Sequence, residues 1–159
     1  AACEAPRFGQ RASGTKHGDW AAYRAATSLA LEQGANICLL LRDGKVVDCD
    51  RCTPLVLLRG PGGEAGSAGP SRRVWRPPEA EGAVHSVTLE VIELALARAG
   101  FQVQEGPPLS LEELEGAEEV IVVGSGVGAR PIRKVAGREV GDGGKRLLKA
   151  AQAALLAER

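Results

Sequence analysis

A lysine stands directly before the first strongly helical stretch of the chain. Lys16 precedes Asp19, which can cap the first turn of a helix that Gly34 would end. The positive end of a helix dipole disfavours a second positive charge, so this position favours the neutral form of the amine. A neutral amine can act as a nucleophile, and an ordinary surface lysine is the alternative interpretation.

A glycine-rich loop follows the most apolar run of the sequence. Residues 120–123 are four consecutive β-branched residues, which predict a strand buried on both faces. The next five residues, GSGVG at 124–128, include three glycines that allow positive φ angles and close approach of a ligand. Successive N–H groups in such a turn can converge on an anion, and open α/β sheets usually bind ligands at the carboxyl ends of strands. A plain tight turn is the alternative.

An acidic segment interrupts an otherwise apolar region. Residues 37–47 predict a hairpin with an Asp-Gly turn at its centre, and a second apolar run follows Pro54. Between them lies DCDRCT at 48–53. An acid such as Asp48 in this place lies either at an exposed edge or against a positively charged group.

The chain has four cysteines, at positions 3, 38, 49 and 52. Cys49 and Cys52 have the CxxC spacing of a metal knuckle or a redox pair, but no second pair follows. Pro54 also blocks the helix that a thioredoxin-like motif would open. Ordinary reduced thiols are therefore favoured, and no metal site is expected.

Composition excludes several classes of protein. Lys plus Arg and Asp plus Glu both number 20, so no overall charge favours binding to nucleic acid or to an acidic membrane. The two Trp, one Tyr and two Phe offer few stacking platforms for single strands. No run approaches the length of a membrane span, and the start lacks the apolar centre of a secretory signal, so we expect a soluble, cytoplasmic protein. The absence of methionine, even at position 1, suggests a fragment, a processed product or an incomplete record, which leaves an organelle open.

The remaining pattern predicts one α/β domain with α+β character, built from two long helices and about six strands. Residues 1–15 are expected to be an irregular lead-in, and the glycine-rich residues 59–73 a flexible surface insertion. A second long helix is predicted at 87–100, with four residues on its apolar side: Val87, Val91, Leu94 and Ala95. Further expected elements are a strand at 101–105, a short helix capped by Ser110, a hairpin through Gly137 and a terminal helix at 142–158.

The glycine loop also invites comparison with a Rossmann-type nucleotide site. That interpretation fails two checks. Pro131 would end the helix that carries the phosphate, and no strand with a terminal acid follows about twenty residues further on.

The order of these features resembles the fold-type IV pyridoxal-phosphate enzymes. This is the class-IV aminotransferase family, which includes branched-chain and D-amino-acid aminotransferases and aminodeoxychorismate lyase. Four features follow the family's order over about residues 14–144: a lysine before a helix, an apolar hairpin that ends in an acid, a glycine before a second helix and a glycine-rich loop after a buried strand. The resemblance implies the family's large domain, with a mixed sheet or pseudo-barrel and two to three packing helices, and pyridoxal 5'-phosphate as cofactor.

The resemblance assigns the chemistry to two side chains. Lys16, in GTKHGDW, corresponds to the lysine that forms the internal aldimine and then moves the proton between the substrate carbon and the cofactor. Asp48 corresponds to the acid that keeps the pyridine nitrogen protonated. The family has glutamate at that position and asparagine where this chain has Thr53.

The resemblance also assigns the contacts to the phosphate. The family's G-I-T-R corresponds to GAVH at 82–85, so the backbone N–H groups of Ala83 and Val84 would face the phosphate. His85 stands in place of the family's arginine, and Val84 lacks a hydroxyl. Ser125 and Gly126 would supply a hydroxyl and an amide to the phosphate or to the substrate carboxylate.

The implied protein is a transaminase or lyase that acts on a small amino acid or keto acid, as a homodimer. Family members carry a smaller domain before the lysine, which supplies an arginine to the phosphate, whereas only fifteen residues precede Lys16 here. The chain is therefore expected to lack that domain or to receive it from a separate polypeptide. The alternative is a catalytically impaired descendant that serves as a binding or dimerisation module.

Overall fold

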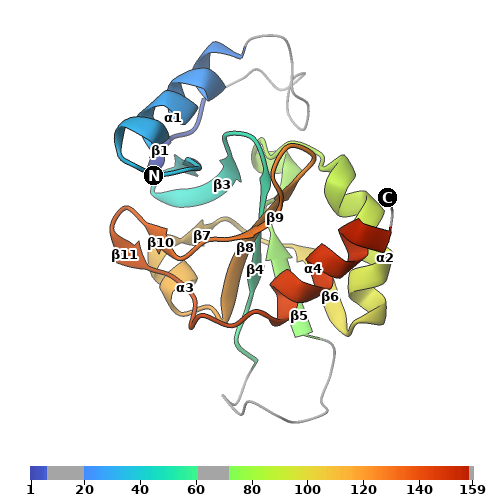
Figure 1. Ribbon diagram of the computed structural model, residues 1–159. Helices are drawn as coiled ribbons and strands as arrows, with labels where there is room; N and C mark the ends of the chain where they lie inside the picture. The colour runs from blue at the N-terminus through green and yellow to red at the C-terminus, as the bar shows by residue number, and fades with distance from the viewer. Residues whose placement is uncertain (7–19, 61–71, 158–159) are drawn as a thin grey trace.

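The computed structural model describes residues 1–6, 20–60 and 72–157 (Figure 1). A four-stranded sheet has the order β1-β2-β3-β7, and a five-stranded sheet has the order β6-β5-β4-β8-β9. Each sheet contains one parallel pair of strands, β1 with β2 in the first and β5 with β6 in the second, and its other pairs are antiparallel. The predicted α/β domain with mixed sheets is confirmed.

The strands of the first sheet are β1 Ala2–Glu4, β2 Leu39–Arg42, β3 Lys45–Cys49 and β7 Leu109–Ser110. Those of the second are β4 Thr53–Leu57, β5 Arg72–Arg76, β6 Phe101–Glu105, β8 Glu119–Gly124 and β9 Gly128–Pro131. A separate hairpin joins β10 Lys134–Val135 to β11 Arg138–Glu139. The helices of the described residues are α1 Ala21–Glu32, α2 Val87–Arg98, α3 Leu111–Glu115 and α4 Arg146–Ala157, and a 3-10 turn lies at Glu79–Glu81.

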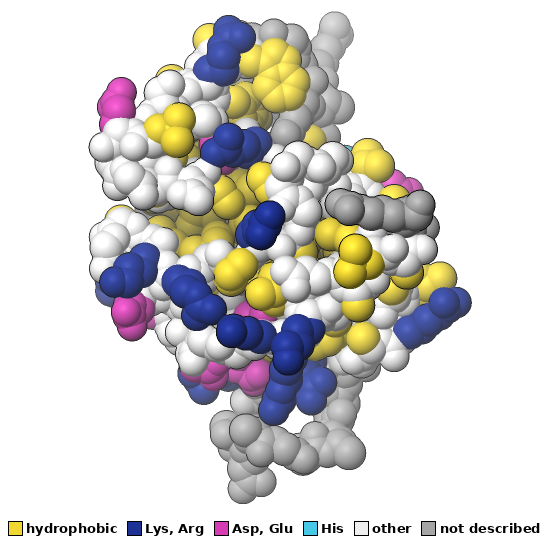
Figure 2. All heavy atoms as spheres, in the orientation of Figure 1, with side chains coloured by type: hydrophobic (Ala, Val, Ile, Leu, Met, Phe, Trp, Pro, Cys, Tyr) yellow, Lys and Arg dark blue, Asp and Glu magenta, His cyan; other side chains and the backbone are white. Residues whose placement is uncertain are grey.

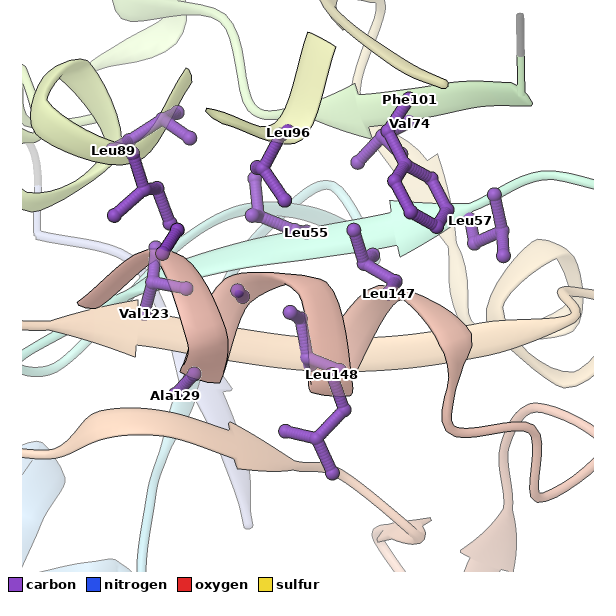
Figure 3. Close-up of a cluster of buried hydrophobic side chains, with 14 residues drawn as sticks. Leu55, Leu57, Val74, Leu89, Leu96, Phe101, Val123, Ala129, Leu147 and Leu148 are labelled. Atoms are coloured by element: carbon purple, nitrogen blue, oxygen red, sulfur yellow. The ribbon is translucent and has the colours of Figure 1, made fainter. Parts of the chain in front are cut away.

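The main core lies between the five-stranded sheet and the pair α2 and α4 (Figure 3). Leu55 of β4, Leu96 of α2 and Leu147 of α4 meet there and are fully buried. Alternate residues of β8 face opposite sides: Ile121 packs in this core, whereas Val122 packs in a second cluster behind the sheet. Residues 120–123 are thus buried on both faces, as predicted.

The α2 helix presents a different face to the core from the one predicted. Its buried apolar residues are Leu89, Ile92 and Leu96, whereas Val87, Val91 and Leu94 are 64%, 45% and 62% exposed. Ala95 is partly buried against the core. The helix carries two apolar stripes, and the sheet buries the one with the larger side chains, which gains more from removal of surface from water.

Residues 1–15 are not irregular throughout, because Ala2–Glu4 form β1. This strand pairs in parallel with β2, in the register Cys3 to Leu40. Three residues are too short to show an alternating pattern, so only the backbone pairing identifies the strand. Residues 7–19 lie outside the described part of the chain, including the predicted cap Asp19. Of the predicted insertion at 59–73, residues 61–71 also lie outside it, and Arg72 and Arg73 begin β5 instead.

The terminal helix begins four residues later than predicted, at Arg146. The carboxylate of Glu119, only 4% exposed, accepts hydrogen bonds from the N–H groups of Leu147 at 2.9 Å and Leu148 at 2.8 Å. Helix starts leave such N–H groups without intrahelical partners. A side chain from β8 therefore fixes where α4 starts. In the described residues, no helix is both long enough and apolar enough to cross a membrane.

Candidate functional site

A tight turn before α2 forms one wall of the candidate site. After the 3-10 turn at Glu79–Glu81, Gly82 adopts a left-handed φ of 99°. A Cβ there would lie 3.4 Å from the Arg42 guanidinium and would need a strained backbone, so glycine is required. Ala83 follows and is buried, and Ser86 caps α2 by accepting the N–H of Leu89 at 3.2 Å. The turn thus leads directly into the positive end of the α2 dipole.

Asp48 reaches this turn from β3. Its side chain is 4% exposed, and its Oδ2 accepts the N–H of Val84 at 3.1 Å. The acid is therefore not at an exposed edge, and one group that it accepts from is a neutral backbone amide shortly before a helix start. Two of the predicted site residues, Asp48 and Val84, are in direct contact.

The second acid of the same segment has a structural role. Asp50 is 2% exposed, and its Oδ2 accepts the hydroxyl of Thr27 at 2.7 Å. Its Oδ1 accepts the N–H of Cys38 at 3.3 Å, and the Arg51 side chain lies 3.7 Å from Oδ2. Asp50 thus joins α1 to the start of β2, while Asp48 faces α2.

A buried tyrosine of α1 lies near Asp48. Tyr23 is 6% exposed, and its pKa is raised by burial and, secondly, by the negative charge of Asp48. Burial disfavours a phenolate, and a nearby carboxylate adds to that effect. The structure therefore adds a neutral phenol hydroxyl to the surroundings of Asp48, which sequence reasoning did not single out.

The glycine loop 124–128 closes the site from the end of β8. A Cβ on Gly124 would lie 3.2 Å from the Cβ of Cys52, so the loop needs glycine at its start. Ser125 and Gly126 are exposed, and the Ser125 hydroxyl lies 3.1 Å from the hydroxyl of Thr88, in the first turn of α2. Nothing lies within 4 Å of a Cβ placed on Gly126, so the backbone is open there.

The start of α2 therefore joins two walls that come from different sheets. Asp48 of the four-stranded sheet contacts Val84, and Ser125 after the five-stranded sheet contacts Thr88, four residues further on. Within the described part of the chain, the amides of Ala83 and Gly126 make no hydrogen bond. Two amides without a hydrogen-bond partner in the described residues, a hydroxyl and a helix start suit an anion, and the buried carboxylate beside them suits a protonated nitrogen.

His85 stands at the exposed margin of the turn. Its ring nitrogens lie 3.0 Å from Glu79 and 3.3 Å from Glu90. The hydrogen bonds to these carboxylates, Glu79 first, raise the pKa of His85, while the contact with His85 lowers the pKa of Glu79. The position thus carries a positive charge that depends on pH.

Two residues beside the candidate site, Thr88 and Tyr23, were not among the site residues predicted from the sequence. Thr88 is 9% exposed and its hydroxyl lies 3.1 Å from that of Ser125, and its signal was a polar residue between Val87 and Leu89 at the start of the helix. Tyr23 had no comparable signal, because a tyrosine on an apolar helix face usually belongs to the core. Lys16 lies outside the described residues, so its role stays a prediction.

A separate groove of about 910 Å³ lies between the loop after α1 and the chain from the glycine loop to the β10–β11 hairpin. Gly126 is one of its lining residues, so the groove meets the candidate site at the loop. Figure 2 shows hydrophobic side chains in a hollow between the part that carries α1 and the part below it, with Lys and Arg side chains around it. The basic residues that line the groove are Arg51, Arg130, Arg133 and Lys134.

Comparison with known proteins identifies the family. A family model described as amino-transferase class IV matches residues 4–135, most of the chain. The chain therefore belongs to the class-IV aminotransferase family. No curated protein sequence matches it.

Solved structures of similar fold have low sequence identity to the chain. A hypothetical aminotransferase from Mycobacterium tuberculosis in its PLP-bound form superposes with a TM-score of 0.78 at 17% identity, over 100% of this chain and 55% of that one. The branched-chain amino acid aminotransferase from Escherichia coli gives 0.77 at 22%, over 96% and 49%. A branched-chain aminotransferase from the thermophilic archaeon Thermoproteus uzoniensis, with norvaline, gives 0.73 at 22%, over 92% and 45%. The chain shares their fold and spans about half of their length.

Proposed function

We propose that this chain is the cofactor-binding part of a pyridoxal-phosphate-dependent aminotransferase or lyase that acts on an amino acid or keto acid. One observation carries the proposal: the buried carboxylate of Asp48 lies against the amide of Val84, at the helix start that Ser125 approaches from the other side. Membership of the class-IV aminotransferase family supports it. The similar structures include one described as PLP-bound and one with N-(5'-phosphopyridoxyl)-L-glutamate, which supports the same cofactor here.

The donors and acceptors present fit pyridoxal phosphate. Asp48 is an acceptor for a protonated pyridine nitrogen, and the burial of its carboxylate strengthens that interaction. The amides of Ala83 and Gly126 and the hydroxyl of Ser125 are donors for the phosphate or for a substrate carboxylate. The Val84 amide fits the same role only if Asp48 releases it, because the two are hydrogen-bonded to each other.

When bound, the cofactor would supply an electron-withdrawing ring conjugated with the substrate. The chain's own residues have simpler tasks in the proposal. Asp48 holds the proton on the ring nitrogen, and the α2 turn and Ser125 orient the phosphate. Lys16 Nζ, as a neutral amine, takes the proton from the substrate carbon and returns it.

The second candidate function is a binding or dimerisation module that has lost catalysis. The contact between Asp48 and Val84 favours it, since the shorter aspartate uses an amide that would otherwise face the phosphate. The exposed residues Val87, Val91 and Leu94 on α2 offer an apolar face for such a role. A module of this kind would self-associate without holding the cofactor.

Titration with pyridoxal phosphate tests the proposal. We expect a new absorbance band, and reduction with borohydride should attach the cofactor covalently to the peptide that contains Lys16. Lys149→Ala, at an exposed position on α4, should label like the parent chain, and Lys16→Ala should not. Labelling of Lys16→Ala at the parental level would reject the assignment. Self-association without any saturable band would select the binding module instead.

A further inference from the structure

Two thiols from distant parts of the sequence meet between β1 and β2. The Sγ atoms of Cys3 and Cys38 lie 3.3 Å apart, although the two residues are 35 positions apart. Parallel pairing places Cys3 beside Leu40, and both cysteines belong to the cluster packed beneath α1. Because a disulfide bond is about 2.05 Å long, the sulfur atoms need to approach by little more than an ångström.

The two thiols differ in their access to solvent. Cys3 is partly exposed, whereas Cys38 is completely buried. Burial, followed by the hydrogen bond with Cys3, raises the pKa of Cys38 to about 12. A dissolved oxidant therefore meets Cys3 first, and an oxidised Cys3 has the thiol of Cys38 within contact distance.

The other two cysteines lack this asymmetry. Cys49 is 1% exposed and Cys52 is 7% exposed, so neither sulfur faces solvent freely. Burial, followed by the hydrogen bond with Cys52, raises the pKa of Cys49, as burial raises that of Cys38, so access to solvent is what separates the two pairs. They serve as an internal comparison within the same molecule.

We propose that Cys3 and Cys38 form an oxidisable dithiol, which reacts with hydroperoxides and closes to a disulfide between β1 and β2. With hydrogen peroxide, the Cys3 sulfur attacks one oxygen, the O–O bond breaks, the departing hydroxide takes the Cys3 proton and leaves as water, and Cys3 becomes a sulfenic acid. The Cys38 sulfur then attacks Sγ of Cys3 and the S–O bond breaks. The Cys38 proton leaves with that hydroxyl as a second water, so two thiols lose two electrons and one hydrogen peroxide becomes two waters.

Closure would join the two ends of a long segment. The ring would run from position 3 to position 38 and would contain α1 together with position 16, the predicted nucleophile. A cross-link of this kind restricts the unfolded chain, so it raises the temperature of unfolding. This inference goes beyond the proposed function and stands without pyridoxal phosphate.

The test oxidises the reduced 159-residue chain with a stoichiometric amount of hydrogen peroxide. The number of free thiols titrated in denaturant should fall from four to two, and the intact mass should fall by the mass of two hydrogen atoms. A peptide map without reductant should link Cys3 to Cys38, and the unfolding midpoint should rise and return after treatment with dithiothreitol. These changes together support the dithiol.

Single variants provide the controls. Cys52→Ser should still lose two thiols and form the same link, whereas Cys3→Ser should form no link at Cys38. Cys3→Ser is the decisive variant, because a substitution of the fully buried Cys38 could disturb the fold. The circular dichroism of Cys3→Ser should match that of the parent chain. A link between Cys49 and Cys52, a chain dimer through Cys3, or further oxidation of Cys3 with Cys38 still reduced would each overturn the inference.

Discussion

The buried carboxylate of Glu119 provides the sharpest test of how this fold is held together. It is 4% exposed and accepts two backbone N–H groups at the start of α4, those of Leu147 and Leu148. Both leucines belong to the main core. In Glu119→Gln the side-chain oxygen can still accept one N–H, but the amide nitrogen faces the other and leaves it without an acceptor.

The expected cost follows from those contacts. A hydrogen bond to a charged group contributes about 1.5–3 kcal/mol, and a negative charge at a helix start adds about 0.3–1 kcal/mol. Losing one bond and the charge should therefore lower the free energy of unfolding by about 2–4 kcal/mol. For a domain of this size, that corresponds to a melting temperature about 4–16 °C lower.

Urea unfolding followed by far-ultraviolet circular dichroism measures the effect. Glu118→Gln is the matched control, because it removes the same charge from the neighbouring residue. The hydrogen bonds of Glu118 to Leu57 and Asp142 are made by its backbone, so the substitution leaves them in place. We expect a clear loss of stability in Glu119→Gln, with an unchanged dependence on urea, and little change in Glu118→Gln. Equal midpoints for the two variants would refute the account of α4.

Two further predictions concern the candidate site itself. Thr88→Val keeps the shape of the side chain but removes the hydroxyl that lies 3.1 Å from that of Ser125. Loss of about 1 kcal/mol should weaken the binding of pyridoxal phosphate about fivefold in a spectroscopic titration. The control Ser28→Ala, at an exposed position on α1, should bind the cofactor as the parent chain does, and an equal affinity for both variants would argue against an orienting role of Thr88. The pKa of His85 is raised, so its contribution to stability is full below the unfolded pKa, about 6.5, and is lost as pH rises through the folded value. His85→Gln should therefore lower the urea midpoint at about pH 6 and have no effect at about pH 9, whereas a deficit of the same size at both values would exclude titration of His85 as the cause.

Local signals in the sequence predicted the elements that depend on neighbouring residues. The strand Phe101–Glu105 has the predicted bounds, and the capping box at Ser110 is present. The Asp-Gly turn of the first hairpin has positive φ at both residues, 51° and 74°, as a tight turn of that kind requires. In these cases the deciding interactions lie within a few positions along the chain.

The elements that the sequence did not predict depend on partners far away. The β1 strand exists because β2 offers a free edge, and α4 starts where a glutamate 27 positions upstream of Arg146 reaches its amides. The core face of α2 could not be chosen from the helix alone, since Val87, Val91 and Leu94 form an equally regular stripe. Thr88 likewise becomes part of the site only when the loop after β8 folds against it.

The candidate site lies at the seam between the two sheets, and this explains why single motifs in the sequence were weak. Asp48 belongs to one sheet and Ser125 follows a strand of the other, and the start of α2 contacts both. Each contact is a single hydrogen bond of 3.1 Å. A ligand whose phosphate meets the α2 turn and Ser125, and whose ring nitrogen meets Asp48, would therefore bind both sheets at once. Binding of that kind should stabilise the whole domain against unfolding, because separation of either sheet would break the site.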